Sequence, residues 1–251
     1  MPESIKTKIS TIDSVEIHHF AKDSSQWWDE GGPFAPLHRL NPVRMAYIKD
    51  QICKHFDLNA KKQEPFKKLD ILDIGCGGGL VCEPLARLGA NVTGADADES
   101  AIATARQHAQ KSGVEISYIA GDAAQLTEEF DVVLALEIIE HVSDIPAFIS
   151  LCKQRLKPGG LLIFSTLNRT AKSYALGIIV AEYLLRWVPK GTHNWKKFVR
   201  PSELAQYSRQ ESLHPDNMTG LIYNPLSGDF ALSETDIDVN YLMSFKQQGK
   251  A

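Results

Sequence analysis

The stretch "LDILDIGCGGGL", residues 69–80, decides the fold of this chain. Its first half is a short apolar run typical of a buried strand, and its second half is a glycine-rich turn that leads into helical spacing. Glycines at Gly75, Gly77 and Gly79 allow positive φ and let a ligand approach the backbone closely. The stretch therefore predicts a strand, a ligand-binding turn and a helix, in that order.

The chain after this stretch continues the alternation of short apolar strands with helical segments. Such alternation predicts a parallel sheet built from right-handed strand–helix–strand units. Two more strands are expected in the tail, around a Pro-Leu-Ser-Gly turn. The further strands are predicted at 90–98, 115–123, 130–137 and 161–168, with helices at 79–89, 99–113 and 144–160.

Residues 1–65 are predicted to form an N-terminal helical extension of a single domain that covers 1–251. Within it, Asn41 and Pro42 have the pattern of a helix cap followed by the first helical position. A chain of 251 residues is enough for one decorated α/β domain.

The global composition excludes several classes of protein. The net charge of −4 does not favour a nucleic-acid partner, and the four cysteines form no CxxC pair or zinc-type spacing. The N-terminus lacks the profile of a secretion signal, and no apolar run reaches the roughly 20 residues that cross a bilayer. We expect a reducing, cytoplasmic setting.

The glycine turn departs from the dinucleotide fingerprint, because Leu80 stands where that fingerprint needs its last glycine. Its glycine spacing, with Asp73 two residues before the first glycine, instead resembles motif I of the class I S-adenosylmethionine (SAM) methyltransferases. Asp96 closes the second strand and could accept hydrogen bonds from both ribose hydroxyls, in a SAM site as in an NAD site. Asp122 follows the third strand, where this family contacts the adenine amine; a turn or helix-cap role is an equally open interpretation.

The motif "EIIEH" follows the fourth strand and contains Glu137, Glu140 and His141. Their i, i+3, i+4 spacing would place them on one face of a helical turn. Two carboxylates and an imidazole suit a divalent cation such as Mg²⁺, which could lower the pKa of a catechol oxygen before its methylation. The alternatives are that these residues cap a helix or line a pocket without metal, or that His141 serves as a general base.

Several stretches together resemble the ubiquinone-biosynthesis O-methyltransferases. The resemblance runs over nearly the whole chain and implies a Rossmann-like class I methyltransferase fold. That fold has a mostly parallel seven-stranded sheet with helices on both faces, an N-terminal helical extension and a helical insert after strand 5. The stretches that carry the resemblance are 27–48, 72–80, 137–142, 164–170, 181–204 and 220–225.

This resemblance implies that the chain methylates ring hydroxyls of polyprenylated catechol or quinol intermediates in ubiquinone biosynthesis. It implies SAM contacts at Arg44, Gly75, Asp96 and Leu136, with Arg44 on the SAM carboxylate and Leu136 packed on the adenine or methionine portion. It also implies dependence on a divalent cation, most simply Mg²⁺, held by the two acids and the histidine of the EIIEH motif. Other proteins of ubiquinone biosynthesis are further implied partners.

The apolar stretch "YALGIIVAEYLLRW", residues 174–187, lies inside a basic segment. Residues 169–200 contain seven Lys or Arg and one acid, a net charge of +6, so the rest of the chain carries −10. A cationic, apolar element suits an anionic membrane surface, and a polyprenyl substrate stays in the bilayer. We therefore expect 169–200 to be a substrate lid or a membrane contact of a protein peripheral to the inner (cytoplasmic) membrane. The alternative is a helix buried on its own sheet.

Other functions stay open at this level. The chain could methylate a soluble phenol or catechol, with the apolar helix as part of the core. It could also be a non-catalytic prenyl-lipid carrier or assembly subunit that retains the fold. A nicotinamide dehydrogenase is disfavoured by Leu80.

Overall fold

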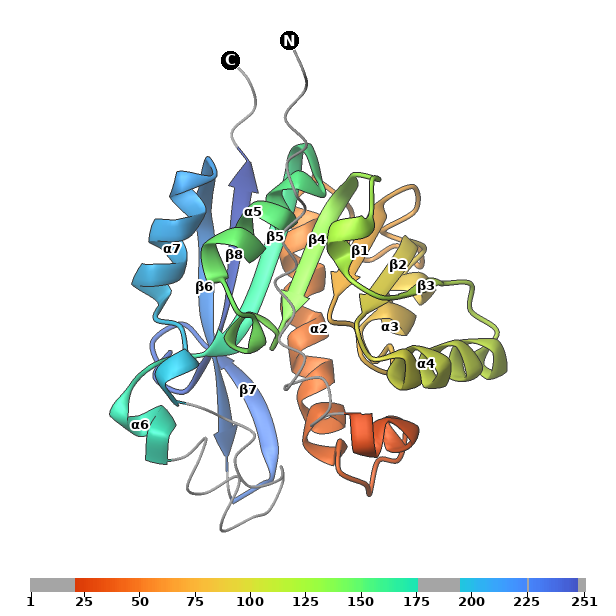
Figure 1. Ribbon diagram of the computed structural model, residues 1–251, viewed down its shortest axis with the longest axis horizontal. Helices are drawn as coiled ribbons and strands as arrows, with labels where there is room; N and C mark the ends of the chain where they lie inside the picture. The colour runs from red at the N-terminus through yellow and green to blue at the C-terminus, as the bar shows by residue number, and fades with distance from the viewer. Residues whose placement is uncertain (1–20, 176–194, 225, 248–251) are drawn as a thin grey trace.

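The computed structural model describes residues 21–175, 195–224 and 226–247. These residues build one eight-stranded sheet of order β3-β2-β1-β4-β5-β8-β6-β7 (Figure 1). The strands are β1 (Asp70–Ile74), β2 (Asn91–Asp96), β3 (Ser117–Ala120), β4 (Phe130–Leu136), β5 (Leu156–Leu167), β6 (Leu213–Asn224), β7 (Asp229–Ser233) and β8 (Asn240–Gln247).

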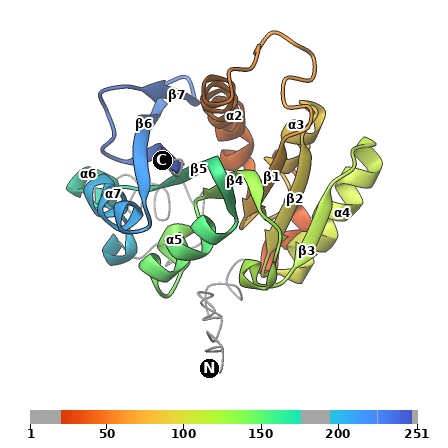
Figure 2. The ribbon, with the colours of Figure 1, turned by 90° about the horizontal axis from the view of Figure 1, so that it is seen from above.

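Helices cover both faces of this sheet (Figure 2). Residues of α2, α3 and α4 share one core cluster with one set of alternate strand residues, including Ile71, and residues of α5 and α7 share a second cluster with the other set, including Leu72. The α-helices are α2 (Ala35–His55), α3 (Cys82–Arg87), α4 (Glu99–Ser112), α5 (Ile145–Gln154), α6 (Ala171–Ser173) and α7 (Pro201–Gln210). The 3₁₀ helices are η1 (Ala21–Gln26), η2 (Ala123–Gln125), η3 (Ile139–His141) and η5 (Trp195–Lys197).

The predicted fold class is confirmed, with one strand more than expected. Strands β1 to β5 are parallel to one another, and β8 runs antiparallel to both β5 and β6, between which it lies. The tail forms the expected pair of strands, β6 and β7. The additional strand is β8, which lies between β5 and β6, while β7 pairs with residues 220–224 along the other edge of β6.

Helix α2 begins seven residues before the predicted start at Pro42, so that part of the prediction is wrong. Pro36 lies at its first turn, where a proline is well tolerated, and Pro42 lies inside the helix. Asn41 does not cap the helix: its side-chain amide donates to the carbonyl of Leu80 at 2.7 Å. The polar side chain that resembles a cap therefore ties the extension to the end of the glycine turn.

The order of the strands creates a switch point at the carboxyl edge of the sheet, between β1 and β4. The chain proceeds from β1 outward through β2 to β3 and then returns to the other side of β1 to form β4. Ligands of such sheets bind at the carboxyl ends of the strands that flank this switch point. The glycine turn follows β1, Asp96 ends β2, and the EIIEH motif follows β4, so the predicted site residues gather at this edge.

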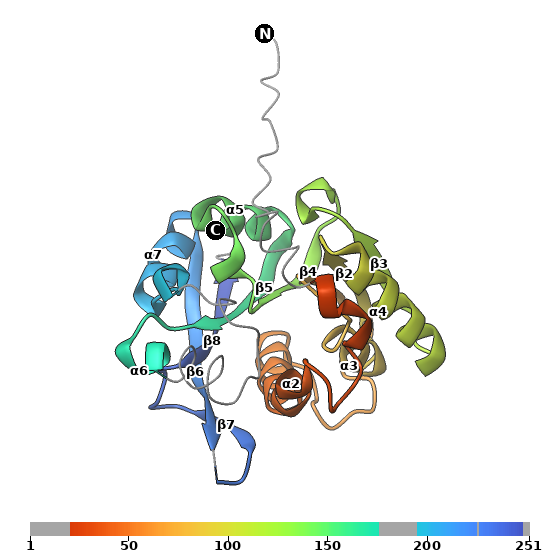
Figure 3. The ribbon, with the colours of Figure 1, turned by 60° about the horizontal axis from the view of Figure 1, so that its bottom comes forward.

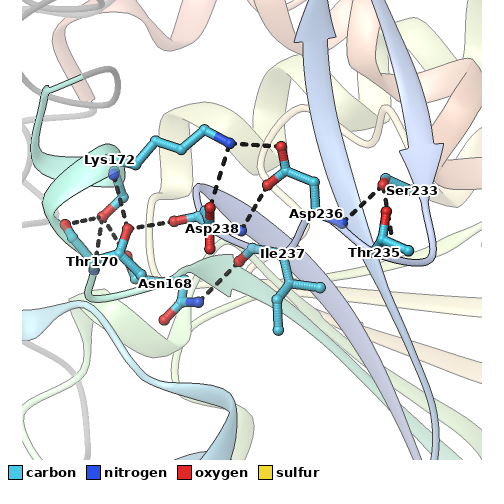
Figure 4. Close-up of polar contacts among 9 residues, drawn as sticks. Asn168, Thr170, Lys172, Ser233, Thr235, Asp236, Ile237 and Asp238 are labelled. Carbon is cyan, nitrogen blue, oxygen red and sulfur yellow. Dashed lines mark hydrogen bonds and ion pairs between the residues drawn. The ribbon is translucent and has the colours of Figure 1, made fainter.

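The start of the predicted insert is held by the loop between β7 and β8 (Figure 4). The Asn168 amide donates to the carbonyl of Ile237 at 2.9 Å, and the Thr170 hydroxyl donates to the carbonyl of Asp238 at 2.6 Å. Lys172 Nζ lies 2.6 Å from a carboxylate oxygen of Asp236. Thus the chain leaves β5 along a fixed path as far as α6.

The predicted apolar helix at 174–187 falls almost entirely outside the described residues. Of its members only Tyr174 and Ala175 are described, and Tyr174 is 49% exposed. Within the described ranges, no helix is long and apolar enough to span a membrane.

Candidate active site

The glycine turn adopts backbone conformations that only glycine takes without strain. Gly75, Gly77 and Gly79 have φ values of +77°, +52° and +86°. A Cβ atom on Gly79 would overlap the hydroxyl of Tyr118, so both the conformation and the space require glycine. Of this turn at the carboxyl end of β1, Gly75 is half-buried and Gly77, Gly78 and Gly79 are buried.

Beneath this turn lies a buried acid. Asp73 is 2% exposed, and burial raises the pKa of its carboxyl to about 7, against the opposing charge of Arg44. The Cys82 thiol donates to it at 3.4 Å. Arg44 is itself buried, its Nη2 donates to Asn41 Oδ1 at 2.9 Å, and burial lowers its pKa. Asp73 would therefore stabilise a cation here, and Arg44 would stabilise an anion. An amino-acid group carries both of these charges, on its ammonium and its carboxylate.

Asp96 faces the turn from the end of β2. One carboxylate oxygen accepts from the backbone N–H of Gly77 and the other from that of Asp98, both at 2.8 Å. An ionised carboxylate has about four acceptor positions, so two remain for a diol. Burial raises the pKa of Asp96.

The other two residues predicted to contact the cofactor lie at neighbouring strand ends. Asp122 caps η2, because its carboxylate accepts from the N–H of Ala124 at 2.8 Å, so the helix-cap interpretation holds for one of its oxygens. Leu136 ends β4 and is 7% exposed. Its strand, β4, pairs with β1, the strand that leads into the glycine turn.

The EIIEH motif does not form the helical turn that its spacing suggested. Glu137 has a φ of +53°, a left-handed conformation that is uncommon for a non-glycine residue, and only Ile139–His141 is helical, as a 3₁₀ turn. The Glu137 carboxylate accepts from the Ser165 hydroxyl at 2.7 Å and from the Asn240 amide at 3.0 and 3.1 Å. The backbone strain is thus held in place by bonds from β5 and β8.

Glu140 is the second buried acid of the site. It is 3% exposed and accepts from the Thr166 hydroxyl at 2.7 Å. Burial raises the pKa of its carboxyl to about 7, the charge of Glu137 adds to this effect, and His141 opposes it. A carboxyl with a pKa near neutrality beside an imidazole is suited to proton transfer.

The predicted metal site is not supported by this arrangement. The part of the chain that the structure describes contains no group of three or more His, Cys, Asp or Glu side chains that could hold a metal ion. The physical reason is that Glu137 leaves the strand with a left-handed backbone instead of a helical one, and that its carboxylate and that of Glu140 bind different protein groups. In this arrangement Glu137, Glu140 and His141 do not fit a divalent cation, and no step of the reaction is derived through one.

Residues 72–164 match a family model described as a methyltransferase domain. The chain is 49% identical to the ubiquinone biosynthesis O-methyltransferase of Dinoroseobacter shibae, over 94% of this chain and 96% of that protein. It is also 49% identical to the protein of that name from a Chelativorans species, over 97% of this chain and 96% of that one.

The chain belongs to the family of ubiquinone biosynthesis O-methyltransferases. The family resemblance and the enzyme class predicted from the sequence, a SAM-dependent O-methyltransferase, are thereby confirmed. 

Solved structures agree on the fold of this O-methyltransferase. A SAM-dependent methyltransferase from Thermotoga maritima superposes with a TM-score of 0.61 at 17% identity, over 92% of this chain and 99% of that one. Magnesium protoporphyrin IX methyltransferase from Synechocystis PCC 6803, with bound S-adenosylhomocysteine, gives 0.59 at 18% identity over 82% of each chain. At these identities the likeness concerns the fold alone.

The sequence did not predict the side chains that donate hydrogen bonds to Glu137 and Glu140 in this O-methyltransferase. Ser165 and Thr166 lie in β5, and Asn240 begins β8. Asn240 pairs with Leu167 of β5, so only the antiparallel insertion of the last strand brings it to Glu137. No sequence pattern links residues so far apart without knowledge of the strand order.

Proposed function

We propose that this chain transfers the methyl group of SAM to a ring hydroxyl of a polyprenylated catechol or quinol in ubiquinone biosynthesis. The observation that carries the proposal is the placement of two polar sites at adjacent strand ends. The glycine turn and Asp96 lie at the ends of β1 and β2, and the acids Glu137 and Glu140 follow β4. A methyl donor and an acceptor bound at these places would lie next to each other.

On the donor side, each polar or charged part of SAM has a side chain that would bind it. Arg44 would bind the carboxylate of the methionine portion and Asp73 its ammonium group, while Asp96 would accept from the ribose hydroxyls. Leu136 would pack against the apolar part of the nucleoside or methionine portion. Bound SAM supplies an activated methyl group, which passes in line to the acceptor oxygen as the carbon–sulfur bond breaks.

On the acceptor side, we assign proton removal to His141. It accepts the phenol proton as the oxygen attacks, and Glu140, in its ionised form, stabilises the imidazolium that forms. Glu137, fixed by Ser165 and Asn240, orients the neighbouring ring hydroxyl. Orientation by these groups is expected to supply most of the catalysis, because the sulfonium already makes the transfer favourable.

A transfer assay tests this proposal. The protein is incubated with SAM labelled in its methyl group and with a prenylated catechol or a short-chain catechol. We expect label in the ether of the prenylated product, and a loss of at least about 100-fold in kcat for His141→Asn, the usual contribution of a general base. Transfer to the short-chain catechol alone would favour the soluble-phenol function, and no SAM binding at all would favour the non-catalytic one.

The divalent cation is tested separately, in the same assay with EDTA and with added Mg²⁺. Loss of turnover in EDTA and its return with Mg²⁺ would support the cation that the family resemblance implies, and would require Glu137 and Glu140 to exchange their present hydrogen bonds for metal ligation. Unchanged turnover in EDTA would remove the cation and leave the transfer assignment intact.

We also propose that the segment 169–200 contacts an anionic membrane surface, so that the enzyme reaches a substrate that stays in lipid. The net charge of +6 supports this. Some of its basic residues are already paired, however: among those that the structure describes, Arg169 pairs with Glu203, and Lys172 pairs with Asp236 and Asp238. The attraction is therefore smaller than the bare charge suggests.

Vesicle flotation tests this contact. We expect the protein to float with vesicles that contain phosphatidylserine and less so with neutral ones, since each Lys near the surface contributes about 1 kcal/mol. The double variant Lys196→Gln, Lys197→Gln should weaken flotation several-fold, whereas Lys61→Gln, Lys62→Gln, exposed on a loop outside the segment, should not. Equal flotation of both variants would argue against this surface.

A further inference from the structure

The described part of the N-terminal extension reaches the glycine turn: η1 lies beside α4 (Figure 3), and the two tryptophans that follow η1 contact the turn. The indole of Trp27 occupies the space over Gly77 and Gly78: a Cβ atom added to either glycine would overlap it. Trp27 is itself held by Phe34, whose ring stacks on it with a centroid distance of 3.9 Å and an interplanar angle of 9°. The imidazole of His38 bonds the carbonyl of Trp27 at 2.8 Å. An ordered aromatic side chain thus covers the middle of the turn.

Trp28 connects the same turn to α4. Its indole N–H donates to the carbonyl of Gly78 at 2.8 Å, and its ring stacks on the imidazole of His108 with a centroid distance of 3.4 Å and an interplanar angle of 4°. His108 Nδ1 lies 2.5 Å from a carboxylate oxygen of Glu83, which is 3% exposed. The carbonyl of Gly78 is therefore bound to a side chain that stacks on an imidazole, and that imidazole is paired with a buried acid.

A third contact reaches the acid expected to bind the ribose. The Ser24 hydroxyl donates to the carboxylate of Asp98, a residue that caps α4. The backbone N–H of Asp98 in turn donates to Asp96 at 2.8 Å. The extension therefore contacts the glycine turn, the cap of α4 and, through Asp98, the end of β2.

We propose that Trp27 and Trp28 are cofactor-positioning residues of this methyltransferase. Trp27 closes the Gly77–Gly78 side of the SAM site against water, and Trp28 holds the Gly78 carbonyl so that the turn keeps its binding conformation. Both lie outside the matched methyltransferase domain, residues 72–164. Affinity for SAM is then a joint property of that domain and the extension. This inference rests on the proposed SAM-dependent function.

Calorimetric titration of the full chain with SAM, together with steady-state kinetics, tests the inference. We expect Trp27→Ala to raise both the Kd and the KM for SAM by about tenfold or more, since it uncovers the turn, while kcat at saturating SAM changes less than threefold. Trp28→Phe keeps an aromatic ring for the stack on His108 and removes the indole N–H that binds the carbonyl of Gly78. We expect it to raise the Kd about three- to tenfold.

The matched control is Phe56→Ala, an aromatic truncation at the C-terminal end of α2, where Phe56 packs against the core cluster that includes Ile71. It should lower the melting temperature while leaving the Kd for SAM within twofold of the original. If Trp27→Ala and Trp28→Phe also leave the Kd and KM within twofold, the two tryptophans are structural only and the inference is wrong. If the unaltered chain binds no SAM, the proposed function fails before the inference is reached.

Discussion

Replacing Glu140 by Gln should make the folded protein more stable at alkaline pH and less active. Burial raises the pKa of this carboxyl to about 7 from an ordinary value of 4.5. Between these two values the folded chain holds a proton that the unfolded chain has released. The free energy of unfolding therefore falls as pH rises through this window, by about 3 kcal/mol in total. A neutral glutamine does not titrate, so the Glu140→Gln variant does not lose this free energy of unfolding between pH 4.5 and pH 7.

The measurement is urea unfolding of both proteins at pH 5, 6, 7 and 8 with linear extrapolation to water. The free energy of unfolding of Glu140→Gln minus that of the original should rise by about 2–3 kcal/mol from pH 5 to pH 8. Asp73, whose pKa burial also raises to about 7, contributes equally to both proteins and cancels in this difference. The lost charge beside His141 should lower kcat at the same time.

A second variant checks the cause. Thr166 donates to Glu140 at 2.7 Å and so favours its ionised form. Thr166→Val should move the pH window of Glu140 upward. A stability difference between Glu140→Gln and the original that stays flat from pH 5 to pH 8 would refute the reasoning, because it would mean that Glu140 is ionised in the folded chain as easily as in water.

The remaining predictions concern the two sides of the site. Gly79→Ala should destabilise the fold by about 2 kcal/mol or more through strain and overlap with Tyr118; Tyr118→Phe, which removes a buried hydroxyl without a hydrogen-bond partner, should recover part of that loss in urea unfolding. Asn240→Ala should lower kcat about tenfold or more with little change in the Kd for SAM, because it frees Glu137; an unchanged kcat would show that Glu137 does not need this bond. Asp96→Ala should weaken SAM binding in calorimetry at least about tenfold, and unaltered affinity would place the ribose elsewhere.

The sheet could be predicted from the sequence because its determinants are local. The apolar runs of β1 to β5 and the glycines of the turn each specify their own conformation, and three of those glycines have the positive φ values for which glycine is needed. The start of α2 could not be predicted in the same way. Asn41 has the local sequence pattern of a helix cap, but its side-chain amide instead donates a hydrogen bond to the carbonyl of Leu80, 39 residues away.

The sequence predicts which residues gather at the carboxyl edge of the sheet, but it does not predict their geometry. The spacing of Glu137, Glu140 and His141 would place them together only on a regular helix, and the left-handed backbone at Glu137 removes that premise. That conformation is stabilised by Asn240, more than 100 residues later, so the local motif does not contain the information. The cover formed by Trp27 and Trp28 is likewise a tertiary contact.

The most direct test of the central claim is a crystal structure with S-adenosylhomocysteine and a prenylated catechol. We predict the sulfur over the glycine turn, the ribose hydroxyls on Asp96, and a ring hydroxyl of the catechol between the sulfur and His141. A nucleoside away from the carboxyl ends of β1, β2 and β4, or a catechol whose hydroxyls face away from Glu137 and His141, would contradict the account.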